Sequence, residues 1–141
     1  MLDNYRDLID ELLGTPTALR GLVGDRAAPE VPPAALAAIA GLRDRDRAVL
    51  GRLQAMLQRR DAYLPALAAT EPVPTPGEPT ALLAEFDTAR GELVSLLMNL
   101  TLKDWERTAI DAVAGEITLA DEVERHVEFD EAAVARIEAE M

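Results

Sequence analysis

The stretch TLADEVERHVEFDEAAVARIEAE, from Thr118 to Glu140, predicts the last and most informative helix of the chain. Its apolar residues recur every three, four or seven positions, which places them on one face of a helix with 3.6 residues per turn. These residues are Ala120, Val123, Val127, Val134 and Ile137. The only histidine of the sequence, His126, and Asp130 fall on or beside this face. An ionisable pair on a face made for burial is either a satisfied structural pair or part of a site.

Length, charge and the lack of cysteine narrow the classes to which the protein can belong. A chain of 141 residues fits one domain, residues 1–141, with a single hydrophobic core. The formal net charge of -12 argues against nucleic acid and anionic membranes as partners, because phosphate would repel it. Without cysteine, the chain offers no disulfide, thiolate nucleophile or thiolate metal site. No signal or membrane-spanning segment is recognised, so we expect a cytoplasmic protein.

Helical spacing of apolar residues recurs along most of the chain, and two proline-rich stretches interrupt it. Main helices are predicted over residues 3–13, 33–60, 79–100 and 118–140, with crossing loops at 24–33 and 70–80. Gly14 is expected to end the first helix, and Thr15 and Pro16 to begin a short extension. Another short helix is expected over 105–113, and no stretch shows the alternation of a strand. The predicted fold class is all-α, a four-helix bundle with two long crossing loops and short accessory helices.

Three segments, residues 31–53, 86–107 and 115–137, carry a further pattern. Its matching residues are Arg90, Asp104, Trp105 and Arg107 in the second segment and Gly115, Thr118, Leu119, Asp130 and Ile137 in the third. In this order they resemble the DinB/YfiT-like family of four-helix-bundle metalloenzymes, which includes thiol-dependent S-transferases. The resemblance covers nearly the whole chain. It implies a divalent metal held by three histidines, a homodimer and a stress-related role.

The positions where the family's metal-binding histidines would fall hold other residues in this chain. They are Gly41, Phe129 and Ala133. None of these side chains can bind a metal, and a catalytic metal site normally needs about three protein ligands. The sequence therefore predicts the fold of the family without its three-histidine site, and we expect no metal cofactor at these positions.

Glu122, His126 and Asp130 leave a displaced metal site open as an alternative. Their i, i+4, i+8 spacing places all three along one side of the last helix. One imidazole and two carboxylates suit zinc, iron or manganese. Pairs of a carboxylate and an imidazole four residues apart also form readily without a metal, and we favour this structural pair.

Asp46 and Arg90 are charged residues on or beside the apolar faces of helices that are expected to pack together. Burying either charge alone would cost several kcal/mol, so each needs a partner. The nearest candidates are each other and the pair of His126 and Asp130. We interpret these residues as a structural ion network, with a polar pocket for a small molecule as the alternative.

Two classes of function remain open. In the first, a bundle that has lost its metal binds a partner chain or a small molecule. In the second, the protein is a thiol-dependent S-transferase-like enzyme with a displaced metal or with none. The resemblance also predicts a homodimer, and so do apolar residues that fall outside the main helix faces. These residues are Ala38, Met56, Val94 and Met98.

Overall fold

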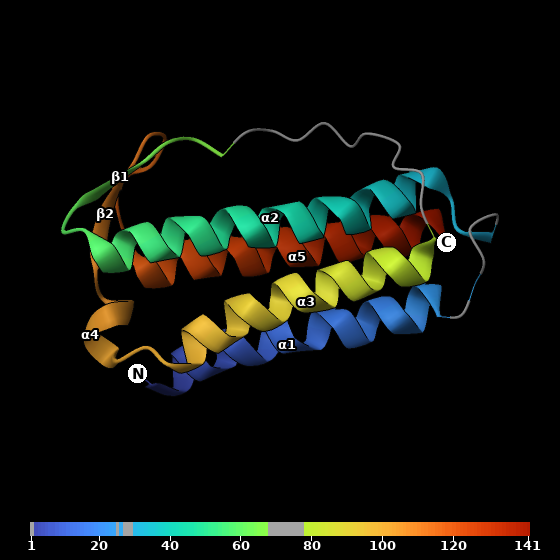
Figure 1. Ribbon diagram of the computed structural model, residues 1–141, viewed down its shortest axis with the longest axis horizontal. Helices are drawn as coiled ribbons and strands as arrows, with labels where there is room; N and C mark the ends of the chain where they lie inside the picture. The colour runs from blue at the N-terminus through green and yellow to red at the C-terminus, as the bar shows by residue number, and fades with distance from the viewer. Residues whose placement is uncertain (1, 25, 27–29, 68–77) are drawn as a thin grey trace.

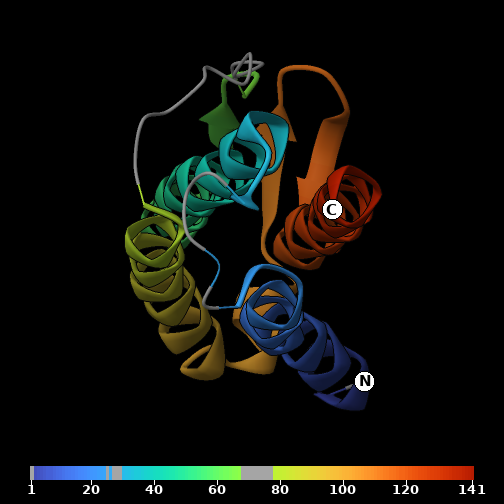
Figure 2. The same ribbon diagram turned by 90° about the vertical axis from the view of Figure 1, so that its right-hand side faces the viewer.

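Four long helices lie side by side in the computed structural model, which describes residues 2–24, 26, 30–67 and 78–141 (Figure 1). They are α1 (Leu2–Val23), α2 (Pro33–Gln58), α3 (Pro79–Met98) and α5 (Leu119–Glu140). Both α1 and α2 pack against α3 and α5. Seen end-on, the helices follow the order α1, α3, α2, α5 around the bundle (Figure 2). The predicted four-helix bundle is therefore confirmed.

The directions of the helices depart from a simple up-and-down order. The chain runs one way along α1 and α5 and the opposite way along α2 and α3 (Figure 1). Two helices that follow each other in sequence, α2 and α3, are therefore parallel neighbours, and residues 59–78 join opposite ends of the bundle. Most of the two predicted crossing loops, residues 25, 27–29 and 70–77, lies outside the described residues.

Helix α1 continues through residues that were predicted to break it. The prediction that a helix ends at Gly14 and a new one begins at Thr15 and Pro16 is wrong, because α1 is one helix with Pro16 inside it. Fully buried leucines on both sides of the proline, Leu12 and Leu19, hold the helix against the core, and this tertiary packing outweighs the local cost of proline. Gly24 ends α1 with a positive φ of 54°.

A small sheet closes one end of the bundle, and the prediction that the chain contains no strand is wrong. Its strands are β1 (Ala62–Leu64), β2 (Thr108–Asp111) and β3 (Gly115–Thr118), in the order β1-β2-β3. The pair β1 and β2 is parallel, and β2 and β3 form an antiparallel hairpin. Each strand has only three or four residues, too few for a period of two to stand out in the sequence.

The helix predicted over 105–113 is replaced by a single turn, α4 (Leu102–Trp105), followed by β2. Thr101 and Asp104 form a reciprocal capping box at the start of this turn. Thr118 and Asp121 do the same at the start of α5. Strands β2 and β3 therefore lie in the chain between two helices, α4 and α5, that each begin with a capping box.

The core consists of two apolar clusters, one toward each end of the bundle. Leu12, Val49, Leu93 and Val127 belong to the cluster beside the sheet. Leu19, Leu42, Phe86 and Ile137 belong to the other cluster. On every long helix the members of the two clusters are separated by a polar residue, so a polar layer crosses the middle of the bundle.

The four apolar residues that were expected to cover a dimer interface differ in exposure, and Ala38 is half-buried. Met56 and Val94 are buried within the chain, at 0% and 4% exposure, and belong to its own core. Met98 is 67% exposed. Within the described residues, no helix combines the length and the apolar character needed to cross a membrane.

Candidate functional site

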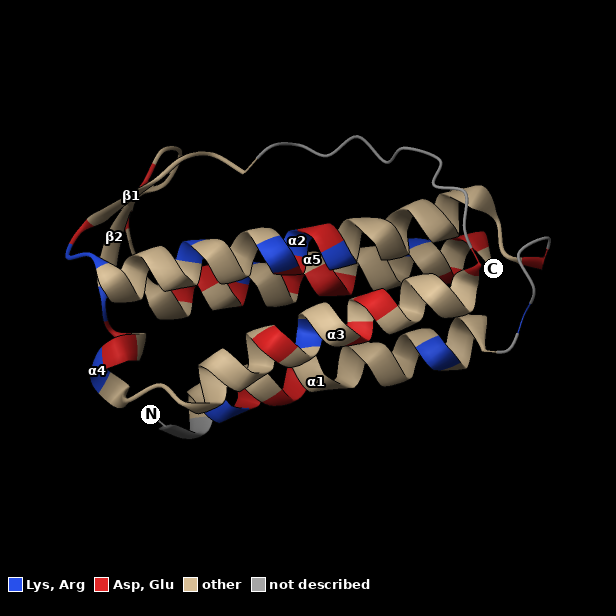
Figure 3. Cartoon of the chain, in the orientation of Figure 1, with Lys and Arg blue, Asp and Glu red and all other residues tan. Residues whose placement is uncertain are grey.

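The polar layer draws one or two side chains from each long helix. They are Thr15 from α1, Asp46 from α2, Arg90 from α3, and His126 and Asp130 from α5. All are buried, the charged residues at no more than 3% exposure. Charges of both signs lie near the middle of α2 and α3 (Figure 3). The structure thus brings together four of the five residues that the sequence indicated for a polar cluster, Asp46, Arg90, His126 and Asp130.

Arg90 lies at the centre of this layer, and all five of its N–H groups donate hydrogen bonds. Nε and Nη2 donate to the two oxygens of Asp46, each at a distance of 2.8 Å. Nη1 and Nη2 donate to the two oxygens of Asp130, at distances of 2.6 and 2.8 Å. The remaining donor of Nη1 reaches the carbonyl of Leu12 over 2.7 Å. A guanidinium has five donors, so Arg90 is fully satisfied.

The carbonyl of Leu12 is available because of Pro16. In an α-helix this carbonyl would accept from the N–H four residues later, and proline has none. The unused acceptor faces the polar layer and receives the fifth hydrogen bond of Arg90. The proline that interrupts the hydrogen bonding of α1 thus supplies an acceptor to α3.

His126 is bound to the layer through one ring nitrogen only. Its Nε2 lies 2.6 Å from Oδ1 of Asp46 and 4.0 Å from Oδ1 of Asp130. Because an ionised carboxylate can only accept, Nε2 donates to Asp46. Nδ1 is buried and has no hydrogen-bond partner among the described residues. The pair of His126 and Asp130 predicted from their spacing is therefore looser than the contact between His126 and Asp46.

Hydrogen bonding sets the charge states at the centre of the layer. Burial raises the pKa of Asp46, but hydrogen bonds from His126 and Arg90 outweigh it, so the pKa of this carboxyl lies below its ordinary value. Burial lowers the pKa of Arg90, and the carboxylates of Asp46 and Asp130 outweigh it in turn, which raises that pKa further above neutrality. Asp46 and Arg90 are therefore a charged pair.

Glu122, which the sequence grouped with His126 and Asp130, belongs to a second buried cluster nearer the sheet. Arg52 donates to carboxylate oxygens of Glu122 and Asp111, each at an N···O distance of 2.5 Å. It also donates to the carbonyl oxygen of Pro65 at 2.6 Å. The displaced metal site predicted with Glu122 is not formed by these residues, because its carboxylate is paired with Arg52. This cluster joins α2, α5 and β2.

Asp111 shapes the turn between β2 and β3. Its Oδ2 accepts from the N–H groups of Val113 and Ala114, and its Oδ1 accepts from Arg52. These hydrogen bonds, that of Ala114 first, hold the pKa of Asp111 well below its usual range. The carboxylate is therefore the form that the fold requires.

The hydrogen bonds of Asp111 predict a dependence of stability on pH. A carboxyl with a lower pKa in the folded state stabilises the fold above its unfolded pKa of about 3.9, and this contribution is lost as pH falls through the folded value. At pH 7 we expect Asp111→Asn to lower the free energy of unfolding by about 1 to 3 kcal/mol. The difference between wild type and variant should shrink below about pH 4. Urea unfolding at pH 7, 5, 4 and 3 measures it, and a constant difference would contradict the assignment.

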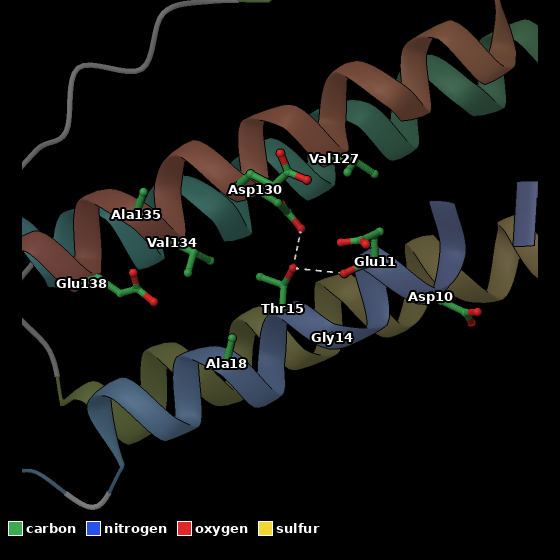
Figure 4. A pocket seen from close by; sticks show the side chains of 11 residues that line it. Asp10, Glu11, Gly14, Thr15, Ala18, Val127, Asp130, Val134, Ala135 and Glu138 are labelled. Atoms are coloured by element: carbon green, nitrogen blue, oxygen red, sulfur yellow. Dashed lines mark hydrogen bonds between the residues drawn. The ribbon is translucent and has the colours of Figure 1, made fainter. Parts of the chain in front are cut away.

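A cleft with a volume of about 560 Å³ lies between α1 and α5 (Figure 4). Five carboxylate residues line it, together with small and apolar ones. The acidic residues are Asp10, Glu11, Asp130, Glu131 and Glu138, and the others are Gly14, Thr15, Ala18, Val127, Val134 and Ala135. No basic side chain is among these described lining residues. Thr15 donates to Oδ2 of Asp130 over 2.8 Å, so the cleft meets the polar layer at this pair.

Comparison with known proteins supports the fold. No model of a known protein family matches the sequence, and no curated protein matches it. The structure is similar to YfiT from Bacillus subtilis, described as a probable metal-dependent hydrolase with an unusual four-helix bundle topology, with a TM-score of 0.80. The similarity covers 97% of this chain and 85% of that one, at 18% sequence identity. The resemblance to the DinB/YfiT-like bundle is thus confirmed at the level of the fold.

The residues at the expected positions of three metal-binding histidines offer no ligand. Gly41 and Ala133 have no donor atom, and Phe129 presents an aromatic ring. The ring of Phe129 is half-buried, with its centroid 6.3 Å from that of His126, and the guanidinium of Arg45 lies over it at 4.7 Å. A three-imidazole metal site does not fit these side chains.

Asp46, His126 and Asp130, which the sequence reasoning grouped as part of an ion network, are also a possible set of metal ligands, a role that it did not consider for Asp46. One ligand atom from each lies within 4.8 Å of the others. The chemistry of these donors suits a divalent metal. With Arg90 in place, however, all four carboxylate oxygens already accept its hydrogen bonds. A metal does not fit beside the guanidinium.

Sequence reasoning missed three residues of the buried clusters, Thr15, Arg52 and Asp111. Thr15 was interpreted as a helix cap because Pro16 follows it. Arg52 was not singled out, although it falls three residues after buried Val49, a spacing that could have indicated burial. Asp111 was placed in a helix that does not exist, so its turn was not recognised.

Proposed function

We propose that this protein binds a small organic cation in the cleft between α1 and α5, and that it does so without a three-histidine metal site. The observation that supports this proposal is the one-sided charge of the cleft, with five carboxylates and no basic residue among the described side chains that line it. Carboxylates in a partly enclosed cleft create a negative potential that concentrates cations. The net charge of -12 adds to this potential.

The apolar part of the lining narrows the class of cation. Val127, Val134, Ala18 and Ala135 offer aliphatic contacts between the acidic residues. A hydrated metal ion or ammonium gains nothing from such contacts, whereas a methylene chain between amino groups does. We therefore propose an alkyl diamine, polyamine or guanidino compound as the ligand.

The polar layer gives the cleft a rigid inner wall. Asp130 is fixed by two hydrogen bonds from Arg90 and one from Thr15. Its negative charge is largely balanced by Arg90, so Asp130 shapes the wall while the other carboxylates of the lining attract the cation. Glu131 and Glu138, which are exposed, are the side chains that would close on the ligand.

Titration calorimetry with spermidine at low ionic strength tests the proposal. We expect one spermidine to bind per chain and the affinity to fall as salt rises. Glu131→Gln with Glu138→Gln removes two cleft charges and should weaken binding by about tenfold. Asp130 is left intact, so the fold should not change.

The matched control removes the same net charge elsewhere. Glu92 on α3 and Glu116 on β3 are exposed and do not line this cleft. Both double variants are compared at about 0.15 M salt, where the Debye length is about 8 Å. Glu92→Gln with Glu116→Gln should then change the affinity by less than about twofold, because exposed charges farther from the ligand than this are screened. Equal losses in both double variants would show that spermidine follows net charge, and the cleft would then not be its site. Failure of the wild-type protein to bind spermidine, agmatine and putrescine would contradict the proposal outright.

We also propose a homodimer, whose apolar contact has to use residues other than Met56 and Val94. Leu13 and Met98 are 48% and 67% exposed and line one surface depression between α1 and α3. Pairing through these residues would remove them from water, and salt should strengthen it by screening the negative charge. Sedimentation velocity in low and high salt, on wild type and Met98→Lys, measures this. A monomer under all conditions would contradict the dimer.

A further inference from the structure

The buried donor set described above has a cation in it already, the side chain of Arg90. We propose that Asp46, His126 and Asp130 form a divalent-cation site in which the guanidinium of Arg90 takes the place of a metal ion. The site becomes able to bind metal when Arg90 is removed. This proposal goes beyond amine binding in the cleft and does not depend on it.

The first argument is the geometry of the donors. Nε2 of His126 lies 2.6 Å from Oδ1 of Asp46 and 4.0 Å from Oδ1 of Asp130. Ligand atoms bound tetrahedrally to one zinc-like ion at about 2.1 Å are about 3.4 Å apart. The observed separations lie on either side of that value, so small side-chain movements would bring the three atoms to one ion. A donor set of one imidazole and two carboxylates suits zinc, iron(II), cobalt(II) or manganese(II).

The second argument is the way Arg90 fills the site. Its guanidinium bridges the two carboxylates and uses all four of their oxygens. A bridging cation between carboxylates from α2 and α5 is what a metal ion would be in the same place. The side chain of Arg90 is 2% exposed and all five of its N–H groups are hydrogen-bonded, so no donor is left to bind water or another residue.

The third argument is the electrostatic balance that remains without Arg90. Asp46 and Asp130 would then be two buried carboxylates without a fixed positive charge. Such a pair binds a cation from solution or takes up protons. In wild type Nε2 of His126 donates to Asp46. Without Arg90, a shift of the ring proton to Nδ1 would free the Nε2 lone pair for the ion, at the cost of an N–H with no partner among the described residues.

The cluster around Arg52 provides the contrast. Arg52 also bridges two buried carboxylates, Glu122 and Asp111, but no histidine belongs to that cluster. If the inference is correct, removal of Arg90 creates a metal site and removal of Arg52 does not. Any cobalt binding that both variants share would come from carboxylates that have lost their arginine, and not from the donor set with His126.

The experiment uses the chelator-treated chain of residues 1–141 and cobalt(II), whose visible absorption reports bound imidazole and carboxylate. Arg90→Ala is expected to bind one cobalt ion per chain, with a rise in thermal midpoint on addition of cobalt or zinc. Wild type and Arg52→Ala should bind it weaker by about a hundredfold or more, because in wild type the guanidinium would have to be displaced. Arg90→Ala with His126→Ala should lose the cobalt spectrum.

Each outcome decides the proposal. Arg90→Ala that folds only when zinc or cobalt is present supports it, and so does binding to an already folded variant. The proposal is overturned if Arg90→Ala and Arg90→Ser both bind no cobalt, whether folded or not. It is also overturned if Arg52→Ala binds cobalt as tightly as Arg90→Ala, or if wild type binds a stoichiometric ion with Arg90 in place.

Discussion

Replacement of Arg90 by methionine should lower the free energy of unfolding by about 3 to 5 kcal/mol, the range measured when one partner of a buried ion pair is removed. Methionine fills much of the volume but donates no hydrogen bond. Asp46 and Asp130 then lose their common partner, and the carbonyl of Leu12 loses its donor. Urea unfolding at pH 7 measures the change.

A double-mutant cycle separates this network effect from loss of packing. Asp46→Asn alone should also destabilise, and the double variant with Arg90→Met should lose less than the sum of the two single changes, because both remove the same contact. Strict additivity would contradict the shared network. Arg20→Met is the surface control. Its pair with Asp87 is half-exposed on the Arg20 side, and the loss should stay below about 1 kcal/mol.

Phe86→Ala is the second change with a large expected effect, about 3 to 5 kcal/mol of unfolding free energy. Phe86 is fully buried, and the guanidinium of Arg90 lies over its ring at 4.8 Å. The alanine variant loses core volume and the cation–π contact together. Phe86→Leu retains most of the volume and should cost only about 1 to 2 kcal/mol.

The chain contains a natural control in its other phenylalanine. Phe129 also lies under an arginine, Arg45, but its ring is half-buried. It stands at one of the positions where the resemblance places a metal-binding histidine. The exposure predicts a loss of about 1 to 2 kcal/mol for Phe129→Ala, since less surface returns to water. Equal losses at the two phenylalanines, measured by thermal and urea unfolding, would show that partial exposure does not reduce the contribution of Phe129.

The long helices were predictable because the residues that they bury recur in the sequence with helical spacing. Val123, Val127, Val134 and Ile137 indicate α5 by spacing alone, and Thr118 with Asp121 marks its start. The sheet was not predictable in the same way. Tyr63 and Leu64 in β1 pair with residues more than forty positions later in the chain, and no local pattern records that pairing.

Some residues of the candidate site were likewise predictable from the sequence, and others were not. Asp46 and Arg90 could be singled out because a charge on an apolar helix face requires a partner. Thr15 and Leu12 could not, because their roles depend on which helix lies opposite them. The carbonyl of Leu12 carries no side-chain signal at all, and its contribution to the site follows only from the position of Pro16 four residues later.

We expect Pro16 and Arg90 to be linked in evolution, although they lie on different helices, because both act on the carbonyl of Leu12. At position 16, any other residue would restore an N–H with which Arg90 would share the two lone pairs of the Leu12 carbonyl. At position 90, a residue without a donor would leave that carbonyl buried and unpaired, which costs about 1 to 3 kcal/mol. Homologous chains should inherit the two residues together or lose them together. A helix-breaking residue in the first helix would then be a sequence marker for an arginine at the centre of the bundle.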